Sequence, residues 1–108
     1  MPHIICHNLN DAEVLAFSRA ILDDISAAAE IERDWFEFYA GNNRCVSERG
    51  YQDKQIYLEI KWFKREKQIQ DQVAYIINDY LRRQGYGNIV IYFDELAKAN
   101  YYENMNQF

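Results

Sequence analysis

The sequence predicts an α+β fold in which a strand–helix–strand unit occurs twice. Two amphipathic helical patterns, one in each half of the chain, lie between segments with the alternating or continuous apolar character of strands. Each helix is long enough to connect parallel strands, and such crossovers are right-handed almost without exception. We therefore expect one domain over residues 1–108, with a four-stranded sheet and two helices on one face of it.

The first unit begins with a short strand over Pro2–Cys6. Asn10 and Asp11 are good N-cap residues, and the apolar side chains that follow recur at three- and four-residue spacing to about Ala29. The aromatic segment Trp35–Tyr39, which a Gly-Asn-Asn turn follows, predicts the second strand.

The second unit begins with Gln55–Phe63, whose strict alternation predicts a half-buried strand. A second apolar stripe predicts a helix from about Arg65 to Arg83, with Gly85 placed to cap its C-terminus. The continuous apolar run Ile89–Phe93 is typical of a strand buried on both faces. The polar segment between the two units predicts a hairpin around residues 44–47.

Composition limits the classes of partner. A net charge of −5 and a pI near 4.9 argue against a nucleic-acid backbone or an anionic membrane surface. No apolar stretch reaches the length of a membrane span and no signal peptide is recognisable, so we expect a cytoplasmic protein. Cys6 and Cys45 are too few for a disulfide framework.

Aromatic residues make up 16% of this small chain, which indicates self-association, because a monomer would expose much of that surface. Tyr101, Tyr102 and Phe108 lie in a polar tail with little core left to bury them. We expect them to dock on a neighbouring subunit.

Pro2 is the residue with the clearest chemical potential. Initiator methionine is normally removed before proline, and the mature chain would then begin with a secondary amine at the edge of a sheet. A free α-amino group titrates at about 7.7 to 8.0, and apolar surroundings move its pKa toward neutral pH, where general acid–base catalysis is effective. The alternative is that Pro2 only starts a strand, where its missing N–H does no harm.

The duplicated unit behind an N-terminal proline resembles the tautomerase superfamily, which includes 4-oxalocrotonate tautomerase and macrophage migration inhibitory factor. The sequence is closest to short bacterial tautomerase-like proteins of unassigned function, through MPHI at the start, Asp34–Phe36, Glu59–Phe63 and Asn100–Asn104. This resemblance implies a homotrimer around a barrel-like core, no cofactor, and a proline that shuttles protons on a small keto–enol substrate at a subunit boundary.

Substrate-binding residues are harder to assign. Arginines that hold a substrate carboxylate in several tautomerases, in the loop after the first strand and on the second strand, are absent here. Arg33 could reach the pocket or pair with Glu30 or Glu32 as a solvated charge. Arg65 follows an aromatic pair near the start of the second helix, where an anion could bind.

Aromatic side chains are a second group of candidates. Tyr39 and Trp62 could supply the apolar wall and the donor that a tautomerase pocket needs, although such residues more often fill a core or an interface. Glu37 and Glu59 could act as a second acid or base, or simply face solvent.

A metal site is disfavoured, because His3 and Cys6 would point to opposite faces of one strand. Two functions therefore remain: a cofactor-independent tautomerase with Pro2 as general base, and a non-catalytic trimeric binding protein on the same scaffold.

Overall fold

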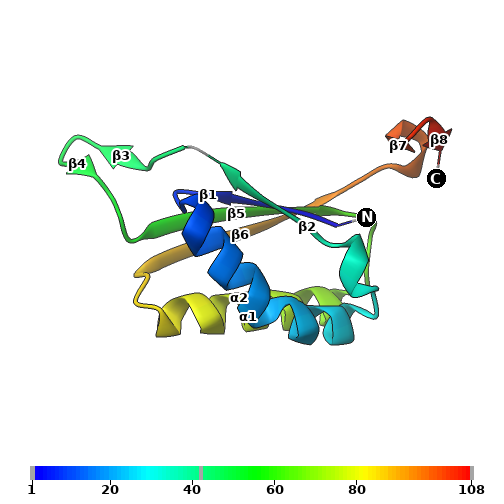
Figure 1. Ribbon diagram of the computed structural model, residues 1–108, viewed down its shortest axis with the longest axis horizontal. Coiled ribbons are helices and arrows are strands. Elements are labelled where there is room, and N and C mark those ends of the chain that lie inside the picture. Colours follow the sequence, from blue (N-terminus) through cyan, green and yellow to red (C-terminus); the bar gives the residue numbers. More distant parts are fainter. Residues whose placement is uncertain (1, 42, 108) are drawn as a thin grey trace.

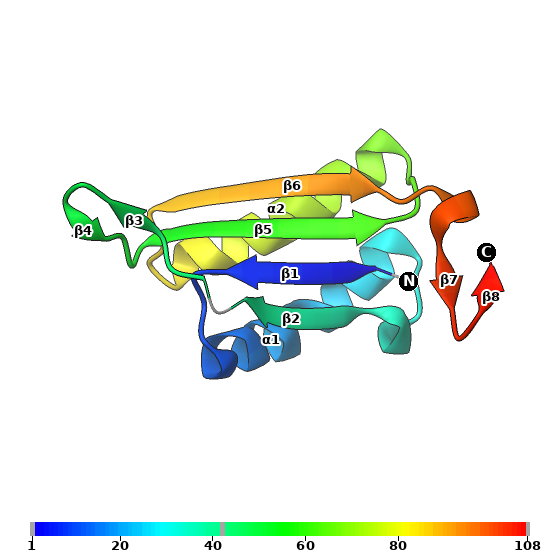
Figure 2. The same cartoon turned by 90° about the horizontal axis from the view of Figure 1, so that it is seen from above.

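The computed structural model describes residues 2–41 and 43–107 and has the predicted α+β architecture. A four-stranded sheet has the order β2-β1-β5-β6, with β1 and β5 antiparallel at its centre and each outer strand parallel to its inner neighbour (Figure 2). Both helices lie on one face of this sheet (Figure 1). The main elements are β1 His3–His7, α1 Asp11–Ala29, β2 Glu37–Gly41, β5 Gln55–Trp62, α2 Lys67–Arg83 and β6 Asn88–Glu95.

Helix α1 begins where its N-cap signal predicts. The Asn10 side chain accepts a hydrogen bond from the Glu13 backbone N–H at 2.8 Å, and the Glu13 carboxylate accepts one from the Asn10 N–H at 2.9 Å. This reciprocal pair satisfies two backbone donors that the first helical turn would otherwise leave free. Of the two N-cap residues that the sequence offered, Asn10 is the cap and Asp11 is the first helical residue.

Helix α2 begins at Lys67, two residues after the predicted start, with Glu66 as a cap that makes no side-chain hydrogen bond. Its C-terminus follows the prediction. Gly85 takes a left-handed φ of 94°, and the N–H of Tyr86 donates to the Leu81 carbonyl at 3.2 Å. Glycine adopts this conformation without the steric cost that a Cβ would add.

The core lies between the sheet and the helices. Alternate residues of β1 and β5 point toward the helices, which contribute their apolar stripes. The largest side chains that are almost fully buried include Ile4, Phe17, Ile25, Leu58, Ile60, Trp62 and Ile77. Burial of these side chains is the main favourable contribution to folding.

Strand β6 differs from the sequence prediction of a strand buried on both faces. Its side chains alternate between half-buried and exposed, because the helices cover one face of the sheet, whereas the described residues leave most of the other face uncovered. We call this second face the open face. Four large side chains on it are each 40–55% exposed: Tyr39, Tyr57, Val90 and Tyr92.

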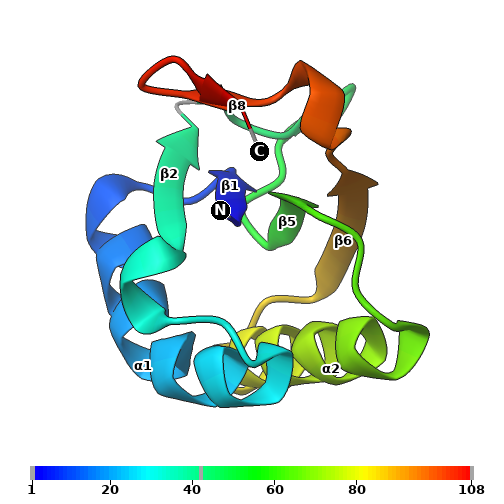
Figure 3. The ribbon, with the colours of Figure 1, turned by 90° about the vertical axis from the view of Figure 1, so that its right-hand side faces the viewer.

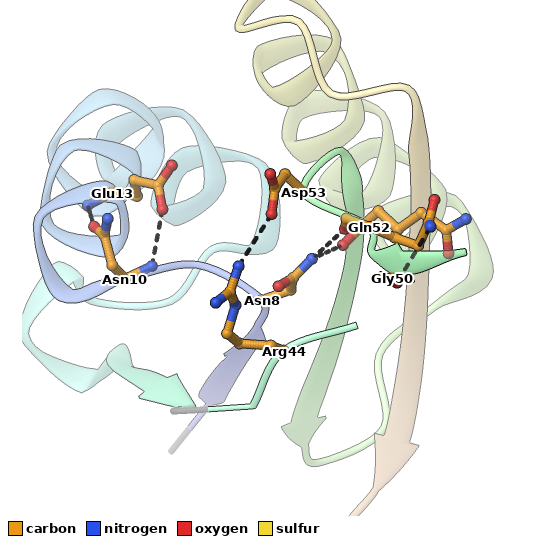
Figure 4. A network of polar contacts seen from close by, with 8 residues as sticks. Asn8, Asn10, Glu13, Arg44, Gly50, Gln52 and Asp53 are labelled. Carbon is orange, nitrogen blue, oxygen red and sulfur yellow. Dashed lines mark hydrogen bonds and ion pairs between the residues drawn. The ribbon is translucent and has the colours of Figure 1, made fainter. Parts of the chain in front are cut away.

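Two hairpins extend from opposite ends of the sheet (Figure 2). The first consists of β3 Val46–Ser47 and β4 Gly50–Tyr51, where the sequence predicts a hairpin. Its base is joined to the loop after β1, since the Asn8 amide donates to the Gln52 and Gln55 carbonyls at 2.8 and 2.7 Å (Figure 4).

The second hairpin is formed by the tail, with β7 Tyr102–Glu103 and β8 Asn106–Gln107. It lies on the side of the sheet away from the helices, at the end where the chain begins (Figure 3). Tyr102 is 59% exposed, and the predicted docking of Phe108 falls outside the described residues.

Candidate functional site

Pro2 is buried at the wall of a cavity of about 660 Å³. It immediately precedes β1, and its carbonyl accepts a hydrogen bond from the Glu37 backbone N–H at 3.0 Å, which fixes it against β2. The apolar part of the cavity wall consists of Pro2, Trp35, Trp62, Phe63 and Leu96. Its charged part consists of Lys64, Arg65 and Lys98.

Two residues that line this cavity each carry a buried hydrogen-bond donor without a partner. Among the described residues, Nε1 of Trp62 and Nε of Arg65 are the buried side-chain nitrogen or oxygen atoms that lack a hydrogen bond. Trp62 ends β5 on its core face, is 1% exposed, and packs against Phe93 with ring centroids 5.0 Å apart. An unsatisfied buried donor costs about 1–3 kcal/mol, so two beside one cavity call for an explanation.

The tail supplies one wall of the cavity. The N–H of Leu96 donates to the Trp62 carbonyl at 2.7 Å, and Lys98 Nζ lies 5.7 Å from the centroid of the Phe63 ring. Tyr101 secures the segment, because its hydroxyl lies 3.1 Å from His3 Nε2 and its ring packs edge-on against Phe63. Burial, followed by the nearby Glu103 carboxylate, raises the pKa of the Tyr101 hydroxyl.

The four substrate-binding candidates lie in different places. Trp62 and Arg65 border the Pro2 cavity. Arg33 is in a 3-10 turn at Arg33–Trp35, where its Nε lies 2.9 Å from the Asp23 carboxylate on α1. It therefore forms an exposed ion pair, but with Asp23 and not with Glu30 or Glu32, the partners that the sequence suggested.

Tyr39, the fourth candidate, lies on the open face, where its hydroxyl donates to the Glu37 carboxylate at 2.5 Å. This hydrogen bond is the main cause of a raised pKa for the Tyr39 hydroxyl. Glu37 also lies 3.6 Å from His3 Nδ1. Both groups are thus engaged in contacts across β1 and β2.

Glu59 also has a partner on the open face. Its carboxylate lies 2.7 Å from His7 Nε2, while His7 Nδ1 is 2.8 Å from the Asn43 amide. The ring of His7 stacks on Tyr57 with centroids 5.4 Å apart. Because both imidazole nitrogens have partners, this cluster holds its histidine in place rather than presenting a free base.

Metal-ligating groups do not converge in the described part of the chain, where no cluster of three or more His, Cys, Asp or Glu side chains is present. Cys6 faces the core, and burial raises the pKa of its thiol to about 12. None of the described helices has the length and apolar character needed to cross a membrane.

Sequence reasoning missed Trp35, Leu96 and Lys98 as cavity residues. They lie on the 3-10 turn before β2 and on the segment after β6, and only the folded chain brings them next to Pro2. No sequence signal marks Leu96 or Lys98. Trp35 belongs to an aromatic segment that the sequence assigns to the second strand, and its 50% exposure is a property of the folded chain.

The arrangement of sheet and helices matches known tautomerase folds. A macrophage migration inhibitory factor-like protein from Entamoeba histolytica has a TM-score of 0.76 and 14% identity, over 99% of this chain and 98% of that one. A malonate semialdehyde decarboxylase has a TM-score of 0.66 and 11% identity, over 94% of this chain and 88% of that one. The fold is therefore that of the tautomerase superfamily, as the sequence resemblance implied.

Within this fold, the chain belongs to the family described as "Domain of unknown function (DUF1904)", whose model matches residues 1–107. The crystal structure of a DUF1904 domain from Sebaldella termitidis has a TM-score of 0.92 and 25% identity, over 100% of both chains. A search of curated proteins finds no match.

Proposed function

We propose that this protein is a cofactor-independent tautomerase that acts on a small keto–enol compound, with the amine of mature Pro2 as general base. The observation that carries this proposal is the burial of Pro2 at the wall of a cavity of about 660 Å³ in a tautomerase fold. Catalysis requires removal of Met1, because a retained methionine turns the prolyl nitrogen into an amide without basicity.

The proposed reaction is a proton transfer. The neutral prolyl nitrogen takes a proton from the carbon next to the substrate carbonyl, and the C–H electron pair forms the enolate. The resulting ammonium returns the proton to oxygen or to carbon, which completes the tautomerisation.

Stabilisation of the enolate oxygen needs a donor that is already in place. We assign this role to Trp62 Nε1 and Arg65 Nε, because both residues line the cavity and neither atom has a partner in the described part of the chain. Trp35 and Phe63 would hold the apolar part of the substrate and exclude water.

Assembly as a homotrimer belongs to the same proposal. Four large side chains are exposed on the open face, and the resemblance to other tautomerases implies that three such faces enclose a common core. A trimer would bury these side chains and would place neighbouring subunits near the Pro2 cavity. A cytoplasmic location remains part of the proposal.

The test compares three forms of the protein on phenylenolpyruvate-type enols, whose ketonisation needs one proton transfer. We expect turnover by the mature protein, reduced turnover by Pro2→Ala, and near-background rates for a form that retains Met1. Intact mass identifies the N-terminus of each sample. Equal rates for all three would exclude Pro2 as the base and would favour the binding-protein alternative.

A further inference from the structure

A second cavity lies at the end of the sheet away from Pro2. It has a volume of about 470 Å³ and is formed where β1 ends and where β5 and β6 begin, beside the base of the β3–β4 hairpin (Figure 2). Pro2 precedes β1, so the length of that strand separates the two cavities. The proposed chemistry at Pro2 makes no use of the second cavity, whose size is in the range that holds a small organic ligand.

One side of this cavity is flat and apolar. The ring of Tyr57 is 40% exposed and stacks on the ring of His7 with centroids 5.4 Å apart. Val90, the partner of Tyr57 on β6, is 47% exposed. Aromatic and aliphatic surface side by side in a cavity suits a flat aromatic ring. Both residues belong to the open face, so the proposed trimer would place a neighbouring subunit beside this wall.

Glu59 supplies negative charge to the cavity. Its Oε2 accepts a hydrogen bond from His7 Nε2 at 2.7 Å, and His7 Nδ1 accepts one from the Asn43 amide at 2.8 Å. These two hydrogen bonds fix a neutral imidazole with its proton on Nε2, so the histidine does not compensate the carboxylate. The second carboxylate oxygen, Oε1, can accept a further hydrogen bond.

The cations near Glu59 have carboxylate partners of their own. Arg44, the cation among the described residues that line the cavity, lies 3.3 Å from the Asp53 carboxylate (Figure 4). Lys61, the next residue on the same face of β5, donates to Asp94 at 2.9 Å. The cavity therefore presents a negatively charged acceptor, which favours a ligand with N–H donors and disfavours an anion.

Carboxamide side chains complete the site. Gln55 and Asn88 begin β5 and β6 and line the cavity together with Asn43. The Gln55 carbonyl accepts a hydrogen bond from the Cys45 thiol at 3.4 Å, which leaves the amide N–H groups to donate to a ligand. Since each carboxamide has two donors and one acceptor, these side chains can bind a ring nitrogen of the ligand.

We infer that this cavity binds a neutral aromatic heterocycle that carries an amino group beside a ring nitrogen. The amino group donates to Glu59 Oε1, and the ring nitrogen accepts a hydrogen bond from Gln55 or Asn88. The ring itself lies on Tyr57 and Val90. This ligand class differs in charge and shape from a small keto–enol compound, and the inference does not depend on the chemistry of Pro2.

Binding can be measured by ¹H–¹⁵N NMR titration with 2-aminopyrimidine, and pyrimidine is the matched ring without the amino group. We expect 2-aminopyrimidine to move the side-chain amide signals of Asn43, Gln55 and Asn88 with saturation. It should bind at least 10-fold more tightly than pyrimidine, the lower bound for loss of a hydrogen bond to a charged group. The indole signals of Trp35 and Trp62 should not move, because both residues line the Pro2 cavity.

Glu59→Gln keeps an acceptor for His7 but removes the charge, and should weaken 2-aminopyrimidine binding by about 10-fold to 100-fold. Asn88→Ala should weaken it by about twofold to 10-fold, the range for a neutral hydrogen bond. Glu37→Gln is the matched control, because Glu37 lies 3.6 Å from the other histidine, His3, and is not among the residues that line this cavity. Its affinity should stay within about twofold of wild type.

Pro2→Ala and the form that retains Met1 should both bind 2-aminopyrimidine normally, so loss of turnover in these forms leaves this inference intact. Equal affinity for the two probes, wild-type affinity in Glu59→Gln, or shifts at the indoles in place of the amides would each overturn the site. The absence of any shift at high millimolar concentration would also overturn it, and would favour a cavity that a neighbouring subunit fills.

Discussion

Replacement of Trp62 by phenylalanine tests whether its indole N–H is an unsatisfied donor kept for a ligand. The substitution removes that N–H together with two ring carbons, while the remaining ring can still pack against Phe93, whose centroid lies 5.0 Å from that of the indole. At about 0.8 kcal/mol for each buried carbon, the lost packing should destabilise the fold by roughly 1.5–2 kcal/mol.

Removal of the unpartnered donor acts in the opposite direction. Relief of an unsatisfied buried N–H is worth about 1–3 kcal/mol, so the two effects nearly cancel. We expect the free energy of unfolding of Trp62→Phe to lie within about 1 kcal/mol of wild type. If the N–H were instead hydrogen-bonded within the folded protein, the loss of that bond would add to the loss of packing. The total destabilisation would then be near 3 kcal/mol or more, or roughly the sum of the two.

Urea denaturation at a fixed protein concentration measures this difference, because association would otherwise shift the apparent stability. Trp35→Phe is the control, since Trp35 lies on the same cavity but is 50% exposed and its N–H can reach water. A loss of 3 kcal/mol or more in Trp62→Phe, with an unchanged rate on phenylenolpyruvate-type enols, would refute the reasoning.

Three further predictions concern other parts of the molecule. Arg33→Gln should leave the rate on phenylenolpyruvate-type enols within about twofold of wild type, since the guanidinium pairs with Asp23 outside the cavity. A loss of about 10-fold would show that Arg33 contributes to the site. Light scattering should find a trimer for wild type and for the control Tyr75→Lys, which lies on the exposed face of α2. Tyr92→Lys on the open face should give smaller species, because burial of an unpaired charge at an interface is costly. A wild-type monomer across micromolar concentrations would contradict this. Burial raises the pKa of the Cys6 thiol from 9.0 to about 12, so between these values the folded protein keeps a proton that the unfolded chain loses. The contribution of the thiol to stability should therefore be complete below pH 9 and fall by up to about 1.4 kcal/mol per pH unit between pH 9 and 12. Cys6→Ala should flatten this slope, and an unchanged slope would exclude the thiol as its cause.

The sequence predicts the helices and inner strands well, because their signals are local. The hydrogen bonds between Asn10 and Glu13 set the start of α1, and the alternation over residues 55–63 places Trp62 on the core face. In the single chain β6 is covered on one face only, since a continuous apolar run does not distinguish cover by the same chain from cover by another.

The site was less accessible to sequence reasoning. Trp62 and Arg65 are recognisable as candidates from their aromatic and basic context, but the lack of a partner for each N–H is a property of the folded chain. The contact of Tyr101 with His3 joins residues 98 positions apart, and no periodicity encodes it. Contacts between segments so distant in sequence depend on the complete topology.

The central claim, that Pro2 carries a free and neutral amine beside the cavity, can be tested most directly by an NMR titration of the Pro2 nitrogen in ¹⁵N-proline-labelled mature protein. Proline occurs once in this sequence, so the signal is unambiguous. Burial and the cations that line the cavity both disfavour the ammonium form, and we predict a pKa below the ordinary value for a free α-amino group. A nitrogen that does not titrate, or one whose pKa is at or above that ordinary value, would contradict the account.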